Sequence, residues 1–302
     1  MIICYCRNKL RAVFFMKIAV VTDSTSYIDR LYQEQNGIVT IPLNIIFEQD
    51  SYAELEEITT EEFYEKMRQT EIFPKTSQPA IGEVVKVFER LLQEYEEIVC
   101  VTLSSGISGS YQTFCTAAQM VDEERISVFD SEASCAKQAW YVYEAVRLRS
   151  EGKNSNEIID YFEKMNDCIR AYFIADDLNH LQRGGRLSGV AALIGGLLQV
   201  KPILHFENKL IVPFEKIRTR KKAIKRIYEL MQQDVDEGKN FHVCVVNGDC
   251  PTDGKEIVEE IKKQFTTHVL SVSESFFGPV IGSHLGPGAL AITWYMRPEE
   301  NE

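Results

Sequence analysis

Residues 102–111 read Thr-Leu-Ser-Ser-Gly-Ile-Ser-Gly-Ser-Tyr, and the organisation of the chain can be worked out from this stretch. An apolar run at 98–101 precedes it, and a segment with helical spacing, 110–121, follows it. A strand, a turn of small hydroxyl residues and a helix start leave several backbone N–H groups unpaired at one place, where the helix dipole also favours negative charge. The stretch therefore predicts an anion-binding loop. The alternative is that Ser110 simply caps the helix and that the other residues form a tight turn.

Strand-like and helical segments alternate through the first half of the chain. The predicted strands and helices are a strand at 17–22, a β-rich run at 38–47 broken by Pro42, a helix at 60–68, a bounded loop at 74–79, a helix at 81–95, a strand at 98–103, and then helix 110–121, strand 125–129, helix 136–150 and a helix from 154 or 155 to 168. Such alternation predicts a parallel sheet. Polar loops at 23–25, 104–110 and 130–131 each follow a strand, and ligands of parallel sheets bind beyond the carboxyl ends of the strands.

The second half predicts another α/β unit. Its expected elements are a strand at 171–175, a buried helix at 189–200, a hairpin of 203–206 and 209–212, helix 219–233, strand 242–247, helix 252–265, strand 268–273, a Gly/Pro-rich loop at 278–288 and a last strand at 289–295. A chain of 302 residues is long for one core. We therefore expect two α/β domains, 16–170 and 171–302. Residues 1–15 are expected to be an N-terminal extension, because they lack the continuous apolar core of a signal peptide.

Composition restricts the class of partner. A net charge of −12 argues against nucleic acid or an anionic membrane as an unaided partner. The longest apolar stretch, 190–200, is too short to span a bilayer, so no stable membrane insertion is expected. Eight cysteines without a C-x-x-C pair favour free thiols in a reducing cytosol, which predicts a cytoplasmic protein.

One catalytic motif comes close to a match. Gly106–Ser110 nearly spells the G-x-S-x-G nucleophile elbow, but serine replaces its last glycine. A lipid or ester hydrolase with Ser108 as nucleophile and His284 as base is therefore the alternative function. The sequence contains no P-loop, no G-x-G-x-x-G and no H-E-x-x-H. Its five histidines are dispersed, so no metal site and no cofactor are expected.

Two further segments carry candidate ligand-binding side chains. His284 lies close to glycines in the predicted loop near the C-terminus, where a side chain can reach a ligand. Arg183 and Arg186 flank Gly184-Gly185, and two guanidinium groups beside permissive glycines suit recognition of a carboxylate or phosphate. A surface turn is the alternative interpretation of this second segment.

Together these motifs resemble the DegV family, the fatty-acid-binding proteins that serve as the binding subunit of bacterial fatty acid kinase. The resemblance runs from Met16 nearly to the C-terminus and rests on five motifs in order: Val-Val-Thr-Asp-Ser-Thr at 20–25, Lys-Thr-Ser-Gln-Pro at 75–79, Leu-Ser-Ser-Gly-Ile-Ser-Gly-Ser-Tyr at 103–111, Arg-Gly-Gly-Arg at 183–186 and Gly-Pro-Gly at 286–288. Residues 1–15 fall outside it.

The resemblance implies a two-domain α/β protein that holds a long-chain, palmitate-like fatty acid in an interdomain tunnel and has no turnover of its own. By the family's pattern, Thr76 and Ser108 hydrogen-bond the carboxylate. His284, Arg183 and Arg186 lie near it, where the fatty acid kinase catalytic subunit phosphorylates it to an acyl phosphate. A third possibility is a regulatory or interaction protein whose lipid is only structural.

Overall fold

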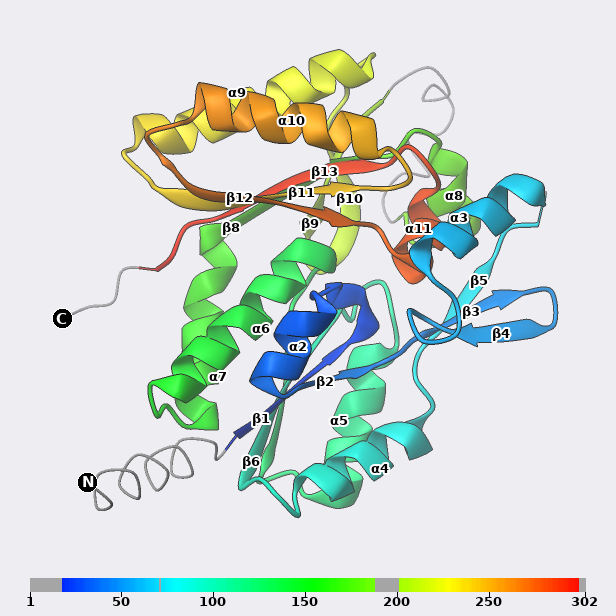
Figure 1. The fold of residues 1–302 in the computed structure, drawn as a ribbon, viewed down its shortest axis with the longest axis vertical. Coiled ribbons are helices and arrows are strands. Elements are labelled where there is room, and N and C mark those ends of the chain that lie inside the picture. Colours follow the sequence, from blue (N-terminus) through cyan, green and yellow to red (C-terminus); the bar gives the residue numbers. More distant parts are fainter. Residues whose placement is uncertain (1–17, 71, 188–200, 299–302) are drawn as a thin grey trace, which may run out of the picture.

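A computed structural model of the chain describes residues 18–70, 72–187 and 201–298 (Figure 1). The predicted extension 1–15 and the predicted helix 189–200 lie outside the described residues. The described strands form three sheets. A four-stranded sheet uses strands from the first 130 residues, and a six-stranded sheet uses strands from residue 169 onward, with a small third sheet beside them.

The four-stranded sheet is parallel, as predicted, in the order β2-β1-β6-β7. Its strands are β1 (Ile18–Asp23), β2 (Ile38–Ile41), β6 (Glu97–Thr102) and β7 (Ile126–Asp130). All six residues of β1 are buried, because helices cover both faces of the sheet. Ala19 and Val21 pack with α4 (Ile81–Leu91) and α5 (Ser110–Val121). The alternating Ile18 and Val20 pack on the other face, in the core that contains α6 (Cys135–Ser150) and α7 (Ser155–Met165).

The six-stranded sheet is mixed, in the order β10-β9-β8-β13-β11-β12. Its strands are β8 (Ile169–Ile174), β9 (Ile203–Glu207), β10 (Leu210–Glu215), β11 (Phe241–Asn247), β12 (Val269–Phe276) and β13 (Leu290–Tyr295). Only β11 and β12 pair in parallel. The helices α9 (Arg220–Asp236) and α10 (Pro251–Gln264) cover its outer face (Figure 1).

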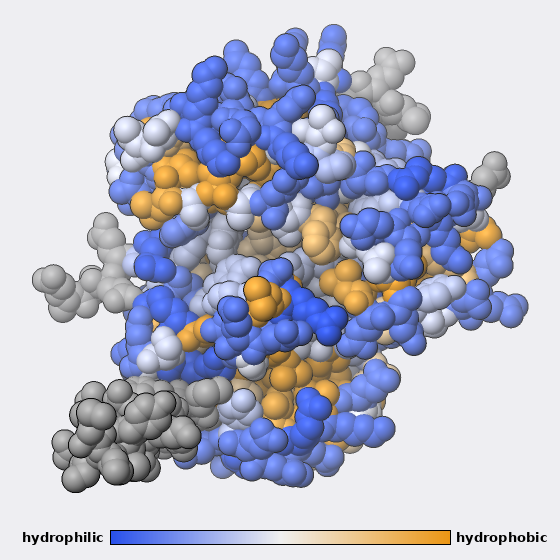
Figure 2. All heavy atoms as spheres, viewed as in Figure 1, coloured by the Kyte–Doolittle hydropathy of each residue, from blue (hydrophilic) through white to orange (hydrophobic). Residues whose placement is uncertain are grey.

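The inner face of the six-stranded sheet packs on the first half of the chain. Phe173, Val246 and Ala291 from this face share one hydrophobic cluster with Val20 and Trp140. A single core therefore joins the two large sheets, and α6 lies between them (Figure 1). On the face seen in Figure 2 polar side chains predominate, while the edge strand β12 exposes Leu270 and Phe276.

The third sheet was not predicted. The strands β4 (Asp50–Ala53), β3 (Asn44–Phe47) and β5 (Lys75–Ser77) form an antiparallel sheet in the order β4-β3-β5, beside α3 (Thr60–Gln69). The predicted loop 74–79 thus contains a strand, in which Thr76 pairs with Ile45. A three-residue strand next to Pro74 is too short to show alternation, and it occupies the edge position where flanking prolines are tolerated.

The predicted loop at 278–288 was also wrong, because Pro279–Leu285 forms the helix α11. Pro279 stands in the first turn, where its missing N–H is no loss, and Gly286 ends the helix with a φ of +74°. Glycine and proline here mark helix ends. The helix α8 (Leu178–Arg183) packs against α11, and the short α2 (Arg30–Asn36) follows a 3-10 turn at Ser24–Ser26.

Candidate functional site

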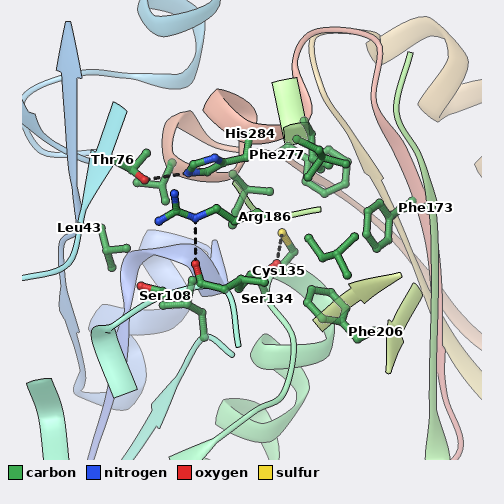
Figure 3. A pocket seen from close by; sticks show the side chains of 18 of the residues that line it. Leu43, Thr76, Ser108, Ser134, Cys135, Phe173, Arg186, Phe206, Phe277 and His284 are labelled. Carbon is green, nitrogen blue, oxygen red and sulfur yellow. Dashed lines mark hydrogen bonds between the residues drawn. The ribbon is translucent and has the colours of Figure 1, made fainter. Parts of the chain in front are cut away.

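An apolar cavity of about 130 Å³ lies where the three sheets meet (Figure 3). It is large enough for several water molecules, each of which needs about 10–15 Å³ by the same measure. Four of the five predicted site residues line it, namely Thr76, Ser108, Arg186 and His284. Figure 3 shows these four gathered on one side of the cavity and the rings of Phe173 and Phe206 on the other. The cavity therefore has a polar end and an apolar end.

The serine turn builds one wall of the polar end. The carbonyl of Ser104 accepts the N–H groups of Ile107 and Ser108, both at 3.2 Å, which coils the turn ahead of α5. The N-cap position is occupied by Gly109, and Ser110 is the first helical residue, so the alternative interpretation, in which Ser110 is the cap, does not hold. Ser108 lines the cavity, and its Oγ lies 3.0 Å from the Ser110 Oγ and accepts the Ser110 N–H at 3.2 Å.

Thr76 and His284 form the opposite wall of this end. Thr76 comes from β5 and His284 from α11, and the Thr76 Oγ1 lies 2.8 Å from the His284 Nε2. Burial, with the nearby charges of Arg186 and His180, lowers the pKa of His284 to about 4. His284 is thus neutral at physiological pH, and it contributes hydrogen bonds rather than charge. Its Nδ1 is buried without a hydrogen-bond partner among the described residues.

The two arginines of the 183–186 segment lie in different places. The Nε of Arg186 donates to the Ile107 carbonyl at 3.1 Å, and its Nη1 donates to the Gly184 carbonyl, so the guanidinium is held against the serine turn at the cavity. Arg183 is exposed and does not belong to the residues that line the cavity. Its guanidinium lies 4.1 Å from the centre of the Phe73 ring. The structure thus brings together four predicted residues and leaves Arg183 at the surface nearby.

Sequence reasoning missed two buried side chains that support the polar end of the cavity. Glu54 is 1 % exposed and accepts the N–H of Val280 at 2.7 Å and the hydroxyl of Tyr27 at 2.9 Å, while that hydroxyl accepts the N–H of Ile281 at 3.2 Å. Glu54 and Tyr27 therefore cap α11, the helix that carries His284. Burial raises the pKa of Glu54 to about 7. In the sequence, Glu54 is one member of an acidic surface-like cluster, and nothing distinguishes it from its neighbours.

Other cavity residues were also missed. Gln78 lies in the Lys-Thr-Ser-Gln-Pro motif and donates to the Thr113 hydroxyl at 2.7 Å. Ser134 and Cys135 enter the cavity from the start of α6, where Cys135 has a φ of +55°. Burial raises the pKa of the Cys135 thiol far above its ordinary value, which favours the protonated thiol over the thiolate. Gln78 could have been found from its place in the Lys-Thr-Ser-Gln-Pro motif, whereas no sequence motif marks Ser134 or Cys135 as site residues.

The geometry does not support a hydrolase. Ser108 pairs with Ser110, and the His284 Nε2 pairs with Thr76, so no described hydrogen bond joins Ser108 to a histidine. A serine nucleophile needs a base within hydrogen-bond reach. Among the described residues, no group of His, Cys, Asp and Glu is arranged to hold a metal ion. No helix in the described part of the chain has the length and apolar character needed to cross a bilayer.

The parallel sheet and the mixed sheet share one core, and an apolar pocket with one hydrogen-bonding end lies between them. These features define the class as an α/β protein with a polarised pocket. The family follows from comparison with known proteins. The model for the DegV family of uncharacterised proteins matches residues 17–297, and the chain belongs to this family.

Known relatives span nearly the whole chain. Protein DegV of Bacillus subtilis is 48% identical over 283 residues, which is 93% of this chain and 100% of the relative. A DegV domain-containing protein of Listeria innocua is 42% identical over 282 residues, 93% of this chain and 99% of the relative.

Solved structures agree with the fold. The crystal structure of DegV from Bacillus subtilis, described as a fatty acid binding protein, matches with a TM-score of 0.87 and 48% identity, over 93% of this chain and 99% of that one. A stearic-acid-binding protein from Eubacterium ventriosum matches with a TM-score of 0.84 and 26% identity, over 93% and 98% of the two chains.

Proposed function

We propose that this protein binds a long-chain, palmitate-like fatty acid in the cavity and presents its carboxylate to a fatty acid kinase catalytic subunit, which converts it to an acyl phosphate. The observation that carries the proposal is the gathering of Thr76, Ser108, Arg186 and His284 at one end of an apolar cavity. The descriptions of its relatives as fatty acid binding proteins support the same ligand class. In this role the protein is a non-catalytic, cytoplasmic binding subunit without a cofactor of its own.

The two ends of the cavity contribute to binding in different ways. A carboxylate leaves water only when several donors replace its hydration, and hydroxyls, a guanidinium and the N–H groups at the start of α5 are available here. Burying the chain of a palmitate-sized acid gains about 0.8 kcal/mol per CH₂, roughly 10 kcal/mol in total. Association and ordering of the chain offset a large part of this gain. The tail then supplies most of the affinity, and the polar end fixes the orientation.

Arg183 is assigned to the partner rather than to the carboxylate. Its exposed position beside the polar end suits contact with the phosphate that a kinase delivers, while Arg186, which lines the cavity, suits the carboxylate. The role of His284 is to position Thr76 through their hydrogen bond.

The first experiment is extraction of the purified protein and mass spectrometry of the released lipid. We expect one long-chain fatty acid per chain, and a protein free of acyl chains would contradict the proposal. Thr76→Val and Ser108→Ala should each weaken retention of the acid by about tenfold, because each removes a hydrogen bond to a charged group. Thr76→Ser keeps the hydroxyl and is the matched control. If Thr76→Val and Ser108→Ala both retain the acid as well as the unaltered protein does, the assignment of Thr76 and Ser108 to the carboxylate is refuted.

The role in phosphorylation needs a separate measurement. Transfer of phosphate from ATP to the bound acid, in the presence of a DegV-partner kinase, should be lost in Arg183→Ala although the acid remains bound. If the kinase leaves the bound acid unchanged in the unaltered protein, the regulatory alternative, in which the lipid is only structural, replaces this proposal. Hydrolysis of a nitrophenyl ester should be absent, and turnover that Ser108→Ala abolishes would revive the hydrolase.

A further inference from the structure

The strands β8 and β9 separate at the apolar end of the cavity. They pair only through Tyr172 with His205 and Phe173 with Leu204. Continuation of this antiparallel register would place Ala171 opposite Phe206, but the structure has no pairing there, although both residues belong to the strands. On its other side Ala171 pairs normally, with Thr293 of β13. The sheet is therefore unpaired between Ala171 and Phe206, and no strand of the described residues closes this end.

A second cavity lies directly beyond the opening. It has a volume of about 580 Å³, opens on the surface, and shares two lining residues with the inner cavity, Ala171 and Phe206. The two cavities thus touch at the place where the strands part. The Phe206 side chain is half-buried, and its ring lies 5.9 Å from that of Phe173. Phe206 therefore lies at the boundary between the two cavities.

Fixed groups frame the opening. The β9–β10 hairpin turns at Asn208 and Lys209, both with positive φ, and the Lys209 carbonyl accepts the Ser104 hydroxyl at 2.6 Å. The Lys209 ammonium lies 3.0 Å from Asp130. The hairpin is therefore held at its tip by the first half of the chain and at its base by the two β8–β9 pairs. The backbone beside Phe206 is thus fixed on both sides of the opening.

The outer cavity is polar and carries basic groups. Lys137 is 9 % exposed, and its ammonium donates to the Asn166 Oδ1 at 2.7 Å, which uses one of its three hydrogens. Arg170 and His205 also line this cavity, with Glu132 as an acidic neighbour. Burial lowers the pKa of Lys137 to about 8, so the ammonium still carries charge near neutral pH. Such a cavity can receive a charged group that the apolar end of the inner cavity cannot.

We propose that the two cavities form one channel gated by Phe206, so that the protein also binds acyl chains with an anionic group at the far end, the α,ω-dicarboxylic acids. One carboxylate occupies the polar end with Thr76 and Ser108, and the other passes Phe206 to reach Lys137. This inference rests on the proposed function, because it uses the same orientation of the chain. A closed inner cavity rejects such ligands, since an unpaired carboxylate cannot be buried among apolar side chains.

The test compares dicarboxylic with monocarboxylic acids of equal length. Competition against the bound acid is measured by native mass spectrometry at pH 8 for hexadecanoic and octadecanoic acids and the corresponding dioic acids. Within each variant the readout is the dissociation constant of the dioic acid divided by that of the monoacid. This ratio cancels general effects of a substitution on folding and on the polar end, because both acids experience them. For the unaltered protein we expect the dioic acid to bind within about tenfold of the monoacid at the better-fitting length, whereas a closed cavity predicts a loss of more than about a thousandfold.

Three variants test whether the chain passes Phe206 and reaches Lys137. Phe206→Trp fills the opening and should raise the ratio at least tenfold, while Phe206→Ala should lower it. Lys137→Met removes the buried ammonium and should raise the ratio without changing the affinity of the monoacid. Rejection of both dioic acids by a protein that binds the monoacids would overturn the channel and leave the proposed function intact. Binding of the dioic acid that is unaffected by Phe206→Trp would also overturn it, and failure to bind either class would remove the proposed function itself.

Discussion

The two ends of the cavity are built in different ways. The polar end takes Thr76, Ser108, Arg186 and His284 from four separate segments: β5, the serine turn, the residues after α8, and α11. The apolar end takes alternate residues of neighbouring strands, such as Phe173, which face the core of one sheet. At the polar end each hydrogen-bonding group is therefore positioned by its own segment, whereas the apolar wall is one continuous surface. We therefore expect single substitutions to act sharply at the polar end and gradually at the apolar end.

The largest effect is expected from reversing the charge at the polar end. Arg186→Glu places a carboxylate next to the ligand carboxylate, and we expect binding to weaken by at least about 100-fold. Arg183→Glu is the matched control, because Arg183 lies outside the cavity over Phe73. Affinity for the acid should change by less than about threefold in this control. Equal losses in the two variants would show that overall charge, rather than the position of Arg186, controls binding.

The pH dependence of stability should show opposite contributions from His284 and Glu54. The pKa of His284 is lowered from 6.5 to about 4, so the folded protein binds fewer protons than the unfolded chain between these values, and stability from this group is lost as pH falls below 6.5. The pKa of Glu54 is raised from 4.5 to about 7, so its contribution favours folding at low pH and is lost as pH rises from 4.5 to 7.

These contributions can be separated by urea unfolding at pH 4.5, 5.5, 6.5 and 7.5. In His284→Gln, the free energy of unfolding should fall with rising pH more steeply than in the unaltered protein, and in Glu54→Gln less steeply. Each difference should reach on the order of 2 kcal/mol across the window. Parallel curves for all three proteins would mean that neither pKa differs between the folded and unfolded states.

A gradual effect is expected at the apolar end. Phe173→Ala removes one ring from the wall and should weaken binding of a long-chain acid by about tenfold, since burial of an aromatic side chain against the tail contributes about 1–2 kcal/mol. The loss should be much smaller for octanoic acid, whose shorter chain makes fewer contacts with the apolar wall. A loss independent of chain length would place Phe173 near the carboxylate and reverse the orientation. Isothermal titration of the two acids measures the difference.

The smallest effect is expected from the glycines beside Arg186. A Cβ on Gly184 would lie 2.3 Å from the His284 Nδ1, so Gly184→Ala should displace the ring and weaken binding about fivefold. Gly185 has a φ of +70° and open space around it, so Gly185→Ala should cost about 1 kcal/mol of stability through strain but leave affinity unchanged. Thermal unfolding and titration of the pair distinguish steric contact from backbone strain.

The difference between the two ends also explains which predictions succeeded. The parallel sheet was predictable because β1 and β6 are continuous apolar runs followed by polar loops, and α5 begins and ends where its spacing indicated. The sequence motifs likewise identified four residues that line the polar end of the cavity. The errors fell on β5 and α11, because a three-residue edge strand and a seven-residue helix between glycines are too short for periodicity to show. The assignments of Thr76, Ser108, His284, Arg183 and Arg186 to ligand contacts remain predictions.

The sequence by itself determined the local parts of this protein: apolar runs that must be buried, a serine turn between strand and helix, and basic and hydroxyl side chains in loops. Tertiary structure decided which of these parts meet. Thr76 and His284 are 208 residues apart and become partners only because β5 joins a third sheet and Glu54 caps α11. Likewise β8 pairs along its length with the distant β13 but with β9 at only two positions. Local propensity acts within a few residues, whereas a cavity is shaped by surfaces that only the folded core brings into contact.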